Sequence, residues 1–600
     1  MKKINFKIIL VIYLPLLLLI NFDIKYFPTE FTIPSFLISY SIFFMLFSIL
    51  KKVNITTMVL GIASFILLFI SYMKESLSGV PLFLSDFFHI GDIGEIVNMV
   101  KRGFFESFFK ILPLLLLNLA IIILLIFLSK KLDFEFKNKK KRIITFALSA
   151  ITIIILFVPI KIKDEFILKR IYLLNNRKDY ATLTSTNDYY NYFGHLSGMY
   201  GNMLESRVYE PDTYNKDNNK KELNKQHKFK EENKEFKKPN IIVVFSESFW
   251  DIDKIDDIKF NKKITKNFNE LKKEGLYFDM ISPSYGGISA NVEYEFLTGG
   301  TLNYYSNSFI PYMNLYNNSK YYDTPSIIKE LRNNGYYTKI TAYSNAELFN
   351  CGEFYKYIGV DSTKFIPDVD KKYKKGEYVS DQYVTDKIIE DLSNKKTDKN
   401  IFYMTLTMQA HMPYDIDKYN KYDINITSSK LDKELSNKLK SYAQGVYDAD
   451  IQLKRLYDYI KEYKEPAILV FYGDHLPYIS GMDKISFFNT KDEKENIFRK
   501  YNTESLILAN FDISSLKNEN NNNLKYLGPD LLGSYILNHM DIEISDYYKW
   551  LYNTRNIIAA SNRFISIDQN GKLYYSNNLS GNMKKISDIR KSLQYELFVR

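Results

Sequence analysis

A near absence of cysteine is the first constraint that this sequence imposes. Cys351 is the only cysteine among 600 residues, so an internal disulfide and any zinc site built on cysteines are excluded. Disorder along the whole chain is excluded as well, because apolar residues make up 46% of it and charged residues only 25%. A chain of this length instead predicts several domains.

Charged residues are almost missing from five apolar runs in the first 160 residues. Each run has about 20 residues, the length that crosses a bilayer, and Lys7 is the main charge inside them. The runs cover 4–22, 32–50, 53–73, 111–129 and 143–160. Their number favours membrane helices over buried core helices, and no small-residue cleavage site marks the first as a signal peptide. Residues 1–160 are therefore predicted to form an all-α domain of five transmembrane helices.

The positive charge of the chain gathers beside these runs. Lys and Arg number 80 against 69 Asp and Glu, a net charge of +11, and this placement favours a membrane surface over nucleic acid as the partner. Basic residues lie before the first run, between the second and third, and between the fourth and fifth: Lys2, Lys3, Lys51, Lys52, Lys130, Lys131, Lys137, Lys139, Lys140, Lys141 and Arg142. The positive-inside rule places these clusters in the cytoplasm. An odd number of spans then puts the rest of the chain on the outer side of the membrane.

The outer part divides by composition. Residues 161–239 are predicted to be a helical and solvated linker, since 203–239 has almost no apolar periodicity. In residues 240–555 short apolar strands alternate with amphipathic helical stretches, which predicts an extracellular α/β domain with a largely parallel sheet. The strands are expected at 241–245, 336–343, 400–408, 467–472 and 504–511. Residues 556–600 form a C-terminal tail, in which NRFISIDQNGKLYYSNN is typical of a β-hairpin.

Two of the predicted strands end on polar residues that could carry chemistry. IIVVF is followed by Ser246, Glu247 and Ser248, and AILVFYG is followed by Asp474 and His475. Ionisable groups at the ends of buried strands are costly unless they bind something. Two carboxylates with an imidazole indicate a site for Mn²⁺, Mg²⁺ or Zn²⁺. For Asp474 and His475 alone, a capping carboxylate and a surface histidine are the alternative.

A third segment, SPSYGGISANVEYEFLTGG, offers a nucleophile. Gly286 and Gly287 predict a tight turn, and Ser289 begins a stretch patterned like a helix. A hydroxyl at a helix N-terminus beside a metal is suited to phosphoryl transfer. The simpler interpretation of this segment alone is that Ser289 is a helix N-cap.

The fourth segment, TLTMQAHMPYD, places His411 just after a predicted strand. His411 and His475 follow apolar strands directly, unlike the other four histidines. A lone histidine of this kind is more often structural. Beside the other three segments, we expect His411 to contact phosphate or to protonate a leaving group.

Taken in order, SESFW, GGISANVEYEFLTGG, QAHMPYD and GDHLP resemble the lipoteichoic acid synthase and phosphoglycerol transferase family. The resemblance covers nearly the whole chain and implies an outer domain with the alkaline phosphatase–sulfatase fold. It implies that Glu247, Ser289, Asp474 and His475 bind a metal, manganese being the usual ion in that family. Ser289 would also be the nucleophile, where the family generally has threonine, and His411 would lie over the substrate phosphate.

The chain departs from that family at one substrate contact. Where the family commonly has a Trp-Asn-Arg stretch against glycerol phosphate, this sequence has Phe349 in place of the Trp and Cys351 in place of the Arg. Loss of a guanidinium weakens phosphate recognition, so the resemblance leaves the transferred group open. Lys356 is an alternative source of the missing charge. The roles of Asn291, Glu293 and Asp381, which lie in matching segments, are also open.

The resemblance implies a membrane-anchored transferase with an anionic lipid donor. Ser289 would take glycerophosphate from phosphatidylglycerol and pass it to a glycolipid or a lipoteichoic-acid-like polymer. One alternative keeps the fold but transfers phosphoethanolamine or another head group, or releases it to water. Another is a catalytically silent membrane protein that binds anionic polymer. A sulfate esterase is disfavoured, because Ser289 is followed by Ala-Asn-Val-Glu and not by the C/S-x-P-x-R pattern.

Overall fold

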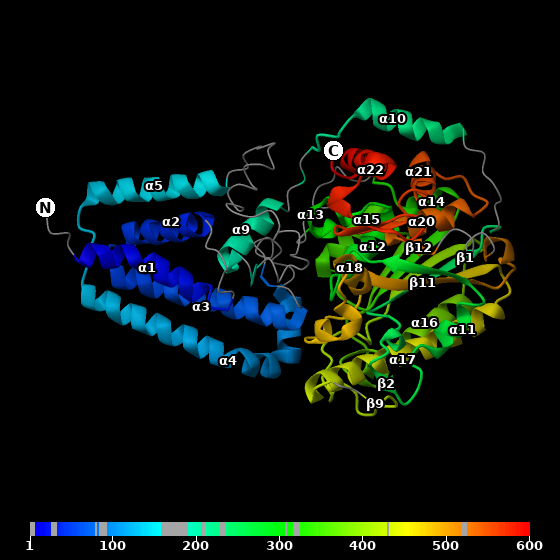
Figure 1. Ribbon diagram of the computed structural model, residues 1–600, viewed down its shortest axis with the longest axis horizontal. Helices are drawn as coiled ribbons and strands as arrows, with labels where there is room; N and C mark the ends of the chain where they lie inside the picture. The colour runs from blue at the N-terminus through cyan, green and yellow to red at the C-terminus, as the bar shows by residue number, and fades with distance from the viewer. Residues whose placement is uncertain are drawn as a thin grey trace. The chain divides into compact units, whose positions relative to one another are not determined.

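The chain forms two compact units, one made largely of residues 1–209 and the other largely of residues 210–600 (Figure 1). This is a computed structural model, and it describes residues 6–25, 33–78, 81–82, 93–157, 190–191, 193–205, 208, 210–228, 236–305, 309–315, 324–346, 348–428, 431–517 and 525–600. Each unit is described by itself below.

In its described residues the first unit is built of helices, in agreement with the predicted all-α class. Its helices are α1 (Phe6–Phe22), α2 (Ile33–Leu50), α3 (Val53–Ser78), α4 (Ile93–Leu132), α5 (Lys139–Phe157) and α9 (His195–Glu205). Among the described residues, three segments are long and apolar enough to cross a membrane: Ile33–Leu50, Val53–Glu75 and Ile111–Leu132. Helix α1 is shorter than these, and α5 begins with four basic residues. The count of five spans therefore stays a prediction.

An eight-stranded sheet forms the centre of the second unit, with the strand order β12-β3-β11-β10-β1-β8-β4-β5. The strands are β1 (Asn240–Ser246), β3 (Leu276–Ile281), β4 (Tyr337–Ala342), β5 (Ser362–Phe365), β8 (Ile401–Leu406), β10 (Ala467–Gly473), β11 (Asn502–Ala509) and β12 (Tyr526–Leu527). Neighbouring strands are parallel except at β11, which runs antiparallel to both β10 and β3. The prediction of a largely parallel sheet is confirmed.

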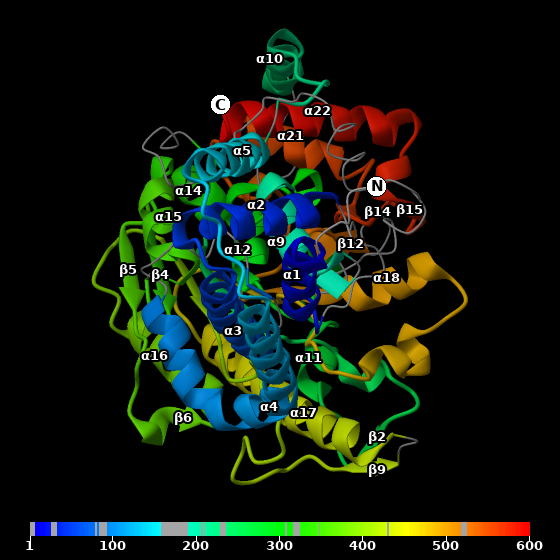
Figure 2. The same cartoon turned by 90° about the vertical axis from the view of Figure 1, so that its left-hand side faces the viewer.

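Helices cover both faces of this sheet, as Figures 1 and 2 show. On one face α11 (Lys266–Leu271), α16 (Asp381–Ser393) and α17 (Lys433–Lys461) bury apolar side chains against the central strands. On the other lie α12 (Ser289–Thr298), α14 (Ile327–Asn333), α15 (Cys351–Ile358), α20 (Pro529–Asn538), α21 (Asp546–Thr554) and α22 (Gly581–Phe598). Every residue of β1 and β10 is buried. Because both faces are covered, these two strands are continuous apolar runs rather than alternating ones.

The last 45 residues pack onto this unit. The predicted hairpin is present as β14 (Ile565–Ile567) and β15 (Leu573–Tyr575), which join β13 (Ala560–Ser561) in a three-stranded antiparallel sheet. Helix α22 then reaches the C-terminal end of α12. Its Gln594 accepts from the Thr301 N–H at 2.8 Å and donates to the Thr301 carbonyl at 2.7 Å, and its Arg590 pairs with Asp530 at 2.6 Å. The C-terminal segment thus supports the helix that begins with Ser289.

Part of the predicted linker also packs on the second unit. Helix α10 (Lys216–Asn224) lies against α21 and α22. The Asn219 side chain donates to the Glu596 carboxylate at 2.6 Å, and the Asn215 N–H donates to the Ser592 hydroxyl at 3.1 Å. Residues 161–189, 192, 206, 207, 209 and 229–235 of that linker lie outside the described residues.

The buried carboxylate of Glu504 on β11 forms a charge cluster with two lysines. Glu504 is fully buried and pairs with Lys254 and Lys272, each at 2.9 Å. Burial alone would raise its pKa, but the two ammonium groups outweigh burial and hold the pKa at about 2. We expect Glu504→Gln to lower the free energy of unfolding by about 3 kcal/mol, because two half-buried lysines lose their fully buried counter-charge.

Urea denaturation monitored by tyrosine fluorescence would measure this loss. The matched control is Glu434→Gln, which removes an exposed partner of Lys438 and should cost at most about 0.5 kcal/mol. Equal unfolding free energies for wild type and Glu504→Gln would contradict the prediction.

Candidate active site

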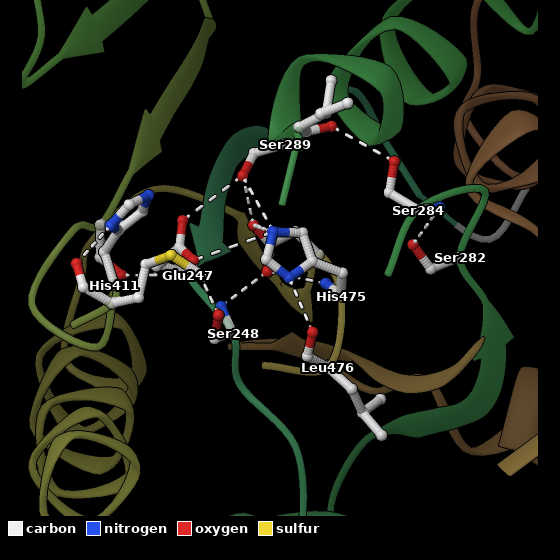
Figure 3. Close-up of polar contacts among 12 residues, drawn as sticks. Glu247, Ser248, Ser282, Ser284, Ser289, His411, His475 and Leu476 are labelled. Atoms are coloured by element: carbon white, nitrogen blue, oxygen red, sulfur yellow. Dashed lines mark hydrogen bonds and ion pairs between the residues drawn. The ribbon is translucent and has the colours of Figure 1, made fainter. Parts of the chain in front are cut away.

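The two predicted polar strand ends meet at one edge of the sheet. Strands β1 and β10 pair in parallel with Ser246 opposite Gly473, so Glu247 and Asp474 leave the sheet side by side. Glu247, Asp474 and His475 are all buried, and one ligand atom from each lies within 4.8 Å of the other two. Figure 3 shows Glu247 and His475 facing the same point. Two carboxylates and an imidazole at this spacing fit a divalent metal ion.

Ser289 lies at the same point. Its hydroxyl donates to Asp474 Oδ2 at 2.7 Å and lies 3.4 Å from both Glu247 Oε2 and His475 Nε2 (Figure 3). The residue is the first of α12, whose N-terminal end carries partial positive charge from aligned peptide dipoles. The hydroxyl is therefore placed among the candidate metal ligands and at the end of a helix that favours anions.

The turn before Ser289 has an unusual backbone. Gly286 and Gly287 have φ of 73° and 153°, and Ile288 follows at 61°. A Cβ on Gly286 would lie 2.6 Å from the Cβ of Tyr478, so only glycine fits there. A β-branched residue such as isoleucine is strained in the left-handed region. Strain of this kind collects at functional sites, where the surrounding structure enforces it.

Two hydroxyl residues that the sequence argument did not assign hold the carboxylates in place. Ser248 has a φ of 52°, which directs its N–H to Asp474 Oδ1 at 2.6 Å, while its hydroxyl donates to Glu247 Oε1 at 2.7 Å. Thr407, just after β8, accepts from the Glu247 N–H at 3.2 Å. Ser248 thus orients both carboxylates, and Thr407 fixes the backbone of Glu247.

The hydrogen bond that His475 makes through Nδ1 leaves its Nε2 atom available to a metal. Its Nδ1 lies 3.1 Å from the Leu476 carbonyl, which can only accept, so Nδ1 carries the proton. Nε2 is then a lone-pair donor directed at Ser289 and the two carboxylates. A carbonyl that fixes the tautomer in this way is the usual second contact of a metal-binding histidine.

Charge is unevenly distributed over the two carboxylates. Burial, followed by the negative charge of Glu247, raises the pKa of Asp474 to about 7. Burial would also raise the pKa of Glu247, but His411, His475 and the Ser248 hydrogen bond outweigh it and lower that pKa. Two buried carboxylates so close together need a counter-charge, and a divalent cation would supply it.

His411 lies on the other side of Glu247 from His475 (Figure 3). Its Nδ1 is 2.8 Å from the Met412 carbonyl and 2.9 Å from the hydroxyl of Tyr378, which itself donates to the Met412 carbonyl at 2.8 Å. Nδ1 therefore carries a proton, and Nε2 is left to meet a ligand. Tyr378 lies outside the four sequence motifs, so its role in orienting His411 could not be predicted.

Cys351 and Phe349 lie in a different environment. Cys351 is the first residue of α15 and is buried, with its sulfur 3.5 Å from the Ala346 carbonyl and 3.8 Å from that of Asn345. Phe349 is half-buried with a φ of 50°. Lys356 is mostly exposed and pairs with Glu353 at 2.5 Å. Its ammonium thus points to solvent, which does not favour it as a replacement for the missing guanidinium.

The three residues of open role are all buried. Glu293, one turn after Ser289 on α12, accepts from the Tyr355 hydroxyl at 2.6 Å, and burial raises its pKa to about 7. Asn291 donates to the Ser284 hydroxyl at 3.4 Å. Asp381 begins α16, and neither of its carboxylate oxygens has a hydrogen-bond partner within the described part of the chain.

The sequence is similar to those of two curated proteins from Rhizobium meliloti. The chain is 29% identical over 344 residues to a putative cyclic beta-1,2-glucan modification protein of Rhizobium meliloti, covering 56% of this chain and 51% of the relative. It is 22% identical over 246 residues to the capsular polysaccharide biosynthesis protein RkpI of the same organism, covering 40% of this chain and 42% of the relative. The matched region thus spans about half the length of these curated relatives or less.

Among solved structures, the fold is similar to that of the Streptococcus pyogenes phosphoglycerol transferase GacH in complex with sn-glycerol-1-phosphate. The TM-score is 0.51 at 21% identity, over 65% of this chain and 96% of that one. The family model for sulfatases matches residues 239–537, the stretch that contains every strand of the large sheet and all four candidate metal ligands. Residues 239–537 therefore form a domain of the sulfatase family, with a fold similar to that of GacH.

Proposed function

We propose that this protein is a metal-dependent phosphoglycerol transferase of the bacterial plasma membrane. It would move glycerophosphate from phosphatidylglycerol to a hydroxyl of a glycolipid or a lipoteichoic-acid-like polymer on the outer surface. The observation that carries the proposal is the position of the Ser289 hydroxyl, 2.7 Å from Asp474 and 3.4 Å from both Glu247 and His475. The names of the two Rhizobium relatives refer to glucan modification and to capsular polysaccharide biosynthesis, which supports a carbohydrate acceptor.

In this proposal Glu247, Ser289, Asp474 and His475 would hold the metal. Manganese is the first choice, with Mg²⁺ or Zn²⁺ as alternatives, because mixed carboxylate and imidazole donors accommodate all three. A bound divalent ion would lower the pKa of the Ser289 hydroxyl and neutralise charge on the phosphoryl oxygens.

The residues of the chain would divide the two transfer steps between them. Ser289 Oγ attacks phosphorus and gives its proton to Asp474, which already accepts its hydrogen bond. The bond from phosphorus to the diacylglycerol oxygen breaks, and that oxygen takes the Nε2 proton of His411, which would enter this step as an imidazolium with both ring nitrogens protonated. The acceptor hydroxyl then attacks the phosphoserine, its proton passes to His411, and Ser289 leaves with the proton from Asp474. The amides at the start of α12 favour the anion throughout.

The membrane unit supports this assignment through proximity. Lys and Arg at one end of the apolar runs predict an extracellular site, where phosphatidylglycerol is concentrated in two dimensions. The partners would therefore be an anionic lipid donor and a glycolipid or polymer acceptor.

Lipids labelled in the head group test the proposal. Full-length protein in mixed micelles should release unlabelled diacylglycerol from phosphatidylglycerol and transfer the labelled glycerophosphate to a glycolipid. Label released to water would instead make the protein a phosphodiesterase, and turnover of phosphatidylethanolamine alone would make it a phosphoethanolamine transferase. Binding of anionic polymer without turnover of any lipid would favour the catalytically silent alternative.

One observation favours a head group other than glycerophosphate. Cys351, where the resemblance implies a guanidinium, is buried and its sulfur faces backbone carbonyls. We expect Cys351→Arg to lower the free energy of unfolding by about 3 kcal/mol and not to improve use of phosphatidylglycerol. Lys356→Ala should leave activity within about twofold, because the ammonium is exposed and pairs with Glu353.

Thermal unfolding and initial rates on phosphatidylglycerol measure both effects. A rise in glycerophosphate transfer in Cys351→Arg, without loss of stability, would indicate that the pocket is a depleted form of a glycerophosphate site. A large loss of activity in Lys356→Ala would assign the phosphate contact to that residue.

A further inference from the structure

The ammonium group of Lys418 lies near the site, and no acidic side chain among the described residues pairs with it. Its Nζ donates to the backbone carbonyl of His411 and lies 5.2 to 5.8 Å from the ring centres of three tyrosines, Tyr378, Tyr414 and Tyr419. Within the described residues no carboxylate forms an ion pair with Lys418. A half-buried cation that contacts a carbonyl and aromatic faces still lacks a negative counter-charge.

The neighbours of Lys418 connect it to the reacting centre. Its carbonyl partner belongs to His411, the residue expected over the phosphate. Tyr378 in its cage orients the His411 ring, and Tyr414 donates to the Ser248 hydroxyl at 3.4 Å, which in turn donates to Glu247. Lys418 also contributes to the lowered pKa of Glu247. The ammonium therefore lies on the His411 side of the candidate metal site.

The acidic groups around Lys418 do not neutralise it by contact. Glu247, Asp381 and Asp415 act on it through space, and burial outweighs them, lowering the pKa of Lys418 to about 7. Asp381 is buried, and neither of its oxygens has a hydrogen-bond partner among the described residues. It therefore accepts no hydrogen bond from the Lys418 ammonium group. An anion that entered the site would stabilise the charged form.

We propose that Lys418 binds a non-bridging oxygen of the phosphodiester that Ser289 attacks, and that it is a substrate-binding residue of this chain. The proposal rests on the proposed function for the identity of the diester. The recognition itself requires only a phosphate group, because a point charge with rotatable N–H donors binds phosphate oxygens without a fixed geometry. Tyr378, Tyr414 and Tyr419 would keep the side chain directed to the site.

The alternative is that Lys418 only fastens the loop that carries His411. Three variants separate the two roles. Lys418→Gln removes the charge but keeps an N–H donor for the His411 carbonyl, and Lys418→Arg keeps the charge. The control is Lys421→Gln, which removes an exposed lysine from the same loop.

Inorganic phosphate is the first probe, and its dissociation constant is measured by calorimetry on full-length protein in detergent, with and without Mn²⁺. We expect Lys418→Gln to weaken phosphate binding by about 10- to 100-fold, Lys418→Arg to recover most of it, and Lys421→Gln to match wild type. Metal affinity and melting temperature should change little in all three. For lipid turnover, the KM for phosphatidylglycerol should rise with the loss of phosphate affinity.

Unchanged phosphate affinity in Lys418→Gln would overturn the proposal, whatever happens to turnover. A fall in melting temperature and kcat with phosphate affinity intact would assign Lys418 to the loop alone. Phosphate binding that depends on Lys418 in a protein that turns over no lipid would contradict the proposed function while leaving Lys418 as an anion contact. Lipid turnover that is the same in Lys418→Gln as in wild type would contradict the role of Lys418 and leave the proposed function in place.

Discussion

Ser289→Ala is expected to abolish lipid turnover, with a loss of roughly 10⁴- to 10⁶-fold. The change removes the only hydroxyl among the described residues that lies against Glu247, Asp474 and His475 together, and so removes the oxygen that would attack phosphorus. Glu247, Asp474 and His475 keep their other hydrogen bonds. Most of the metal should therefore remain bound, as elemental analysis of the purified variant would show.

Two further variants make this result specific. Ser284→Ala changes a hydroxyl in the same turn, whose nearest acceptor is the Ile288 carbonyl at 3.3 Å, and should cost less than about tenfold. Ser289→Thr should keep part of the activity, because a threonine hydroxyl can occupy the same position. Full activity in Ser289→Ala would remove the covalent mechanism.

Asp474→Asn should lose both metal and activity. The amide keeps the shape of the carboxylate and an oxygen for the N–H groups of Ser248 and His475, which lie 2.6 and 2.7 Å away. It replaces the anionic oxygen next to Ser289 with a donor that cannot bind a cation. We expect metal affinity to fall at least about 100-fold, since even outer contacts of metal ligands contribute 10- to 100-fold.

The melting temperature gives a readout of this loss apart from turnover. A metal at about 100 times its dissociation constant stabilises a folded protein by about 2.7 kcal/mol, so Mn²⁺ should raise the melting temperature of wild type but not of Asp474→Asn. Asp483→Asn, at an exposed aspartate in the segment that follows β10, is the control. An equal rise in Asp474→Asn would place the metal elsewhere.

Local chemistry explains why part of the site could be predicted from sequence. Glu247 and Asp474 each follow a run of buried apolar residues, and parallel neighbours bring such positions to one edge. Ser289 follows two glycines, which the turn requires at positive φ. In each case the signal lies within a few residues of the functional group, so no knowledge of the three-dimensional pairing is needed.

Other features depend on contacts between distant segments. Tyr378 reaches His411 across 33 residues. Lys418 lies in a loop with no motif of its own and contacts the ring of the distant Tyr378. The antiparallel direction of β11 was likewise not predictable, because strand direction depends on sheet order and not on the apolar pattern. The burial of Cys351 depends on how α15 packs, and the comparison with the Trp-Asn-Arg stretch carries no information on that packing.

The contacts of α22 set a boundary for work with soluble fragments. A fragment that stops at residue 555 would contain the matched sulfatase region and every candidate ligand. It would nevertheless leave the Asp530 carboxylate and the Thr301 backbone groups without Arg590 and Gln594, at the end of the helix that positions Ser289. Poor activity in such a fragment would reflect a loosened α12, so assays on the isolated second unit should use chains that continue to Arg600.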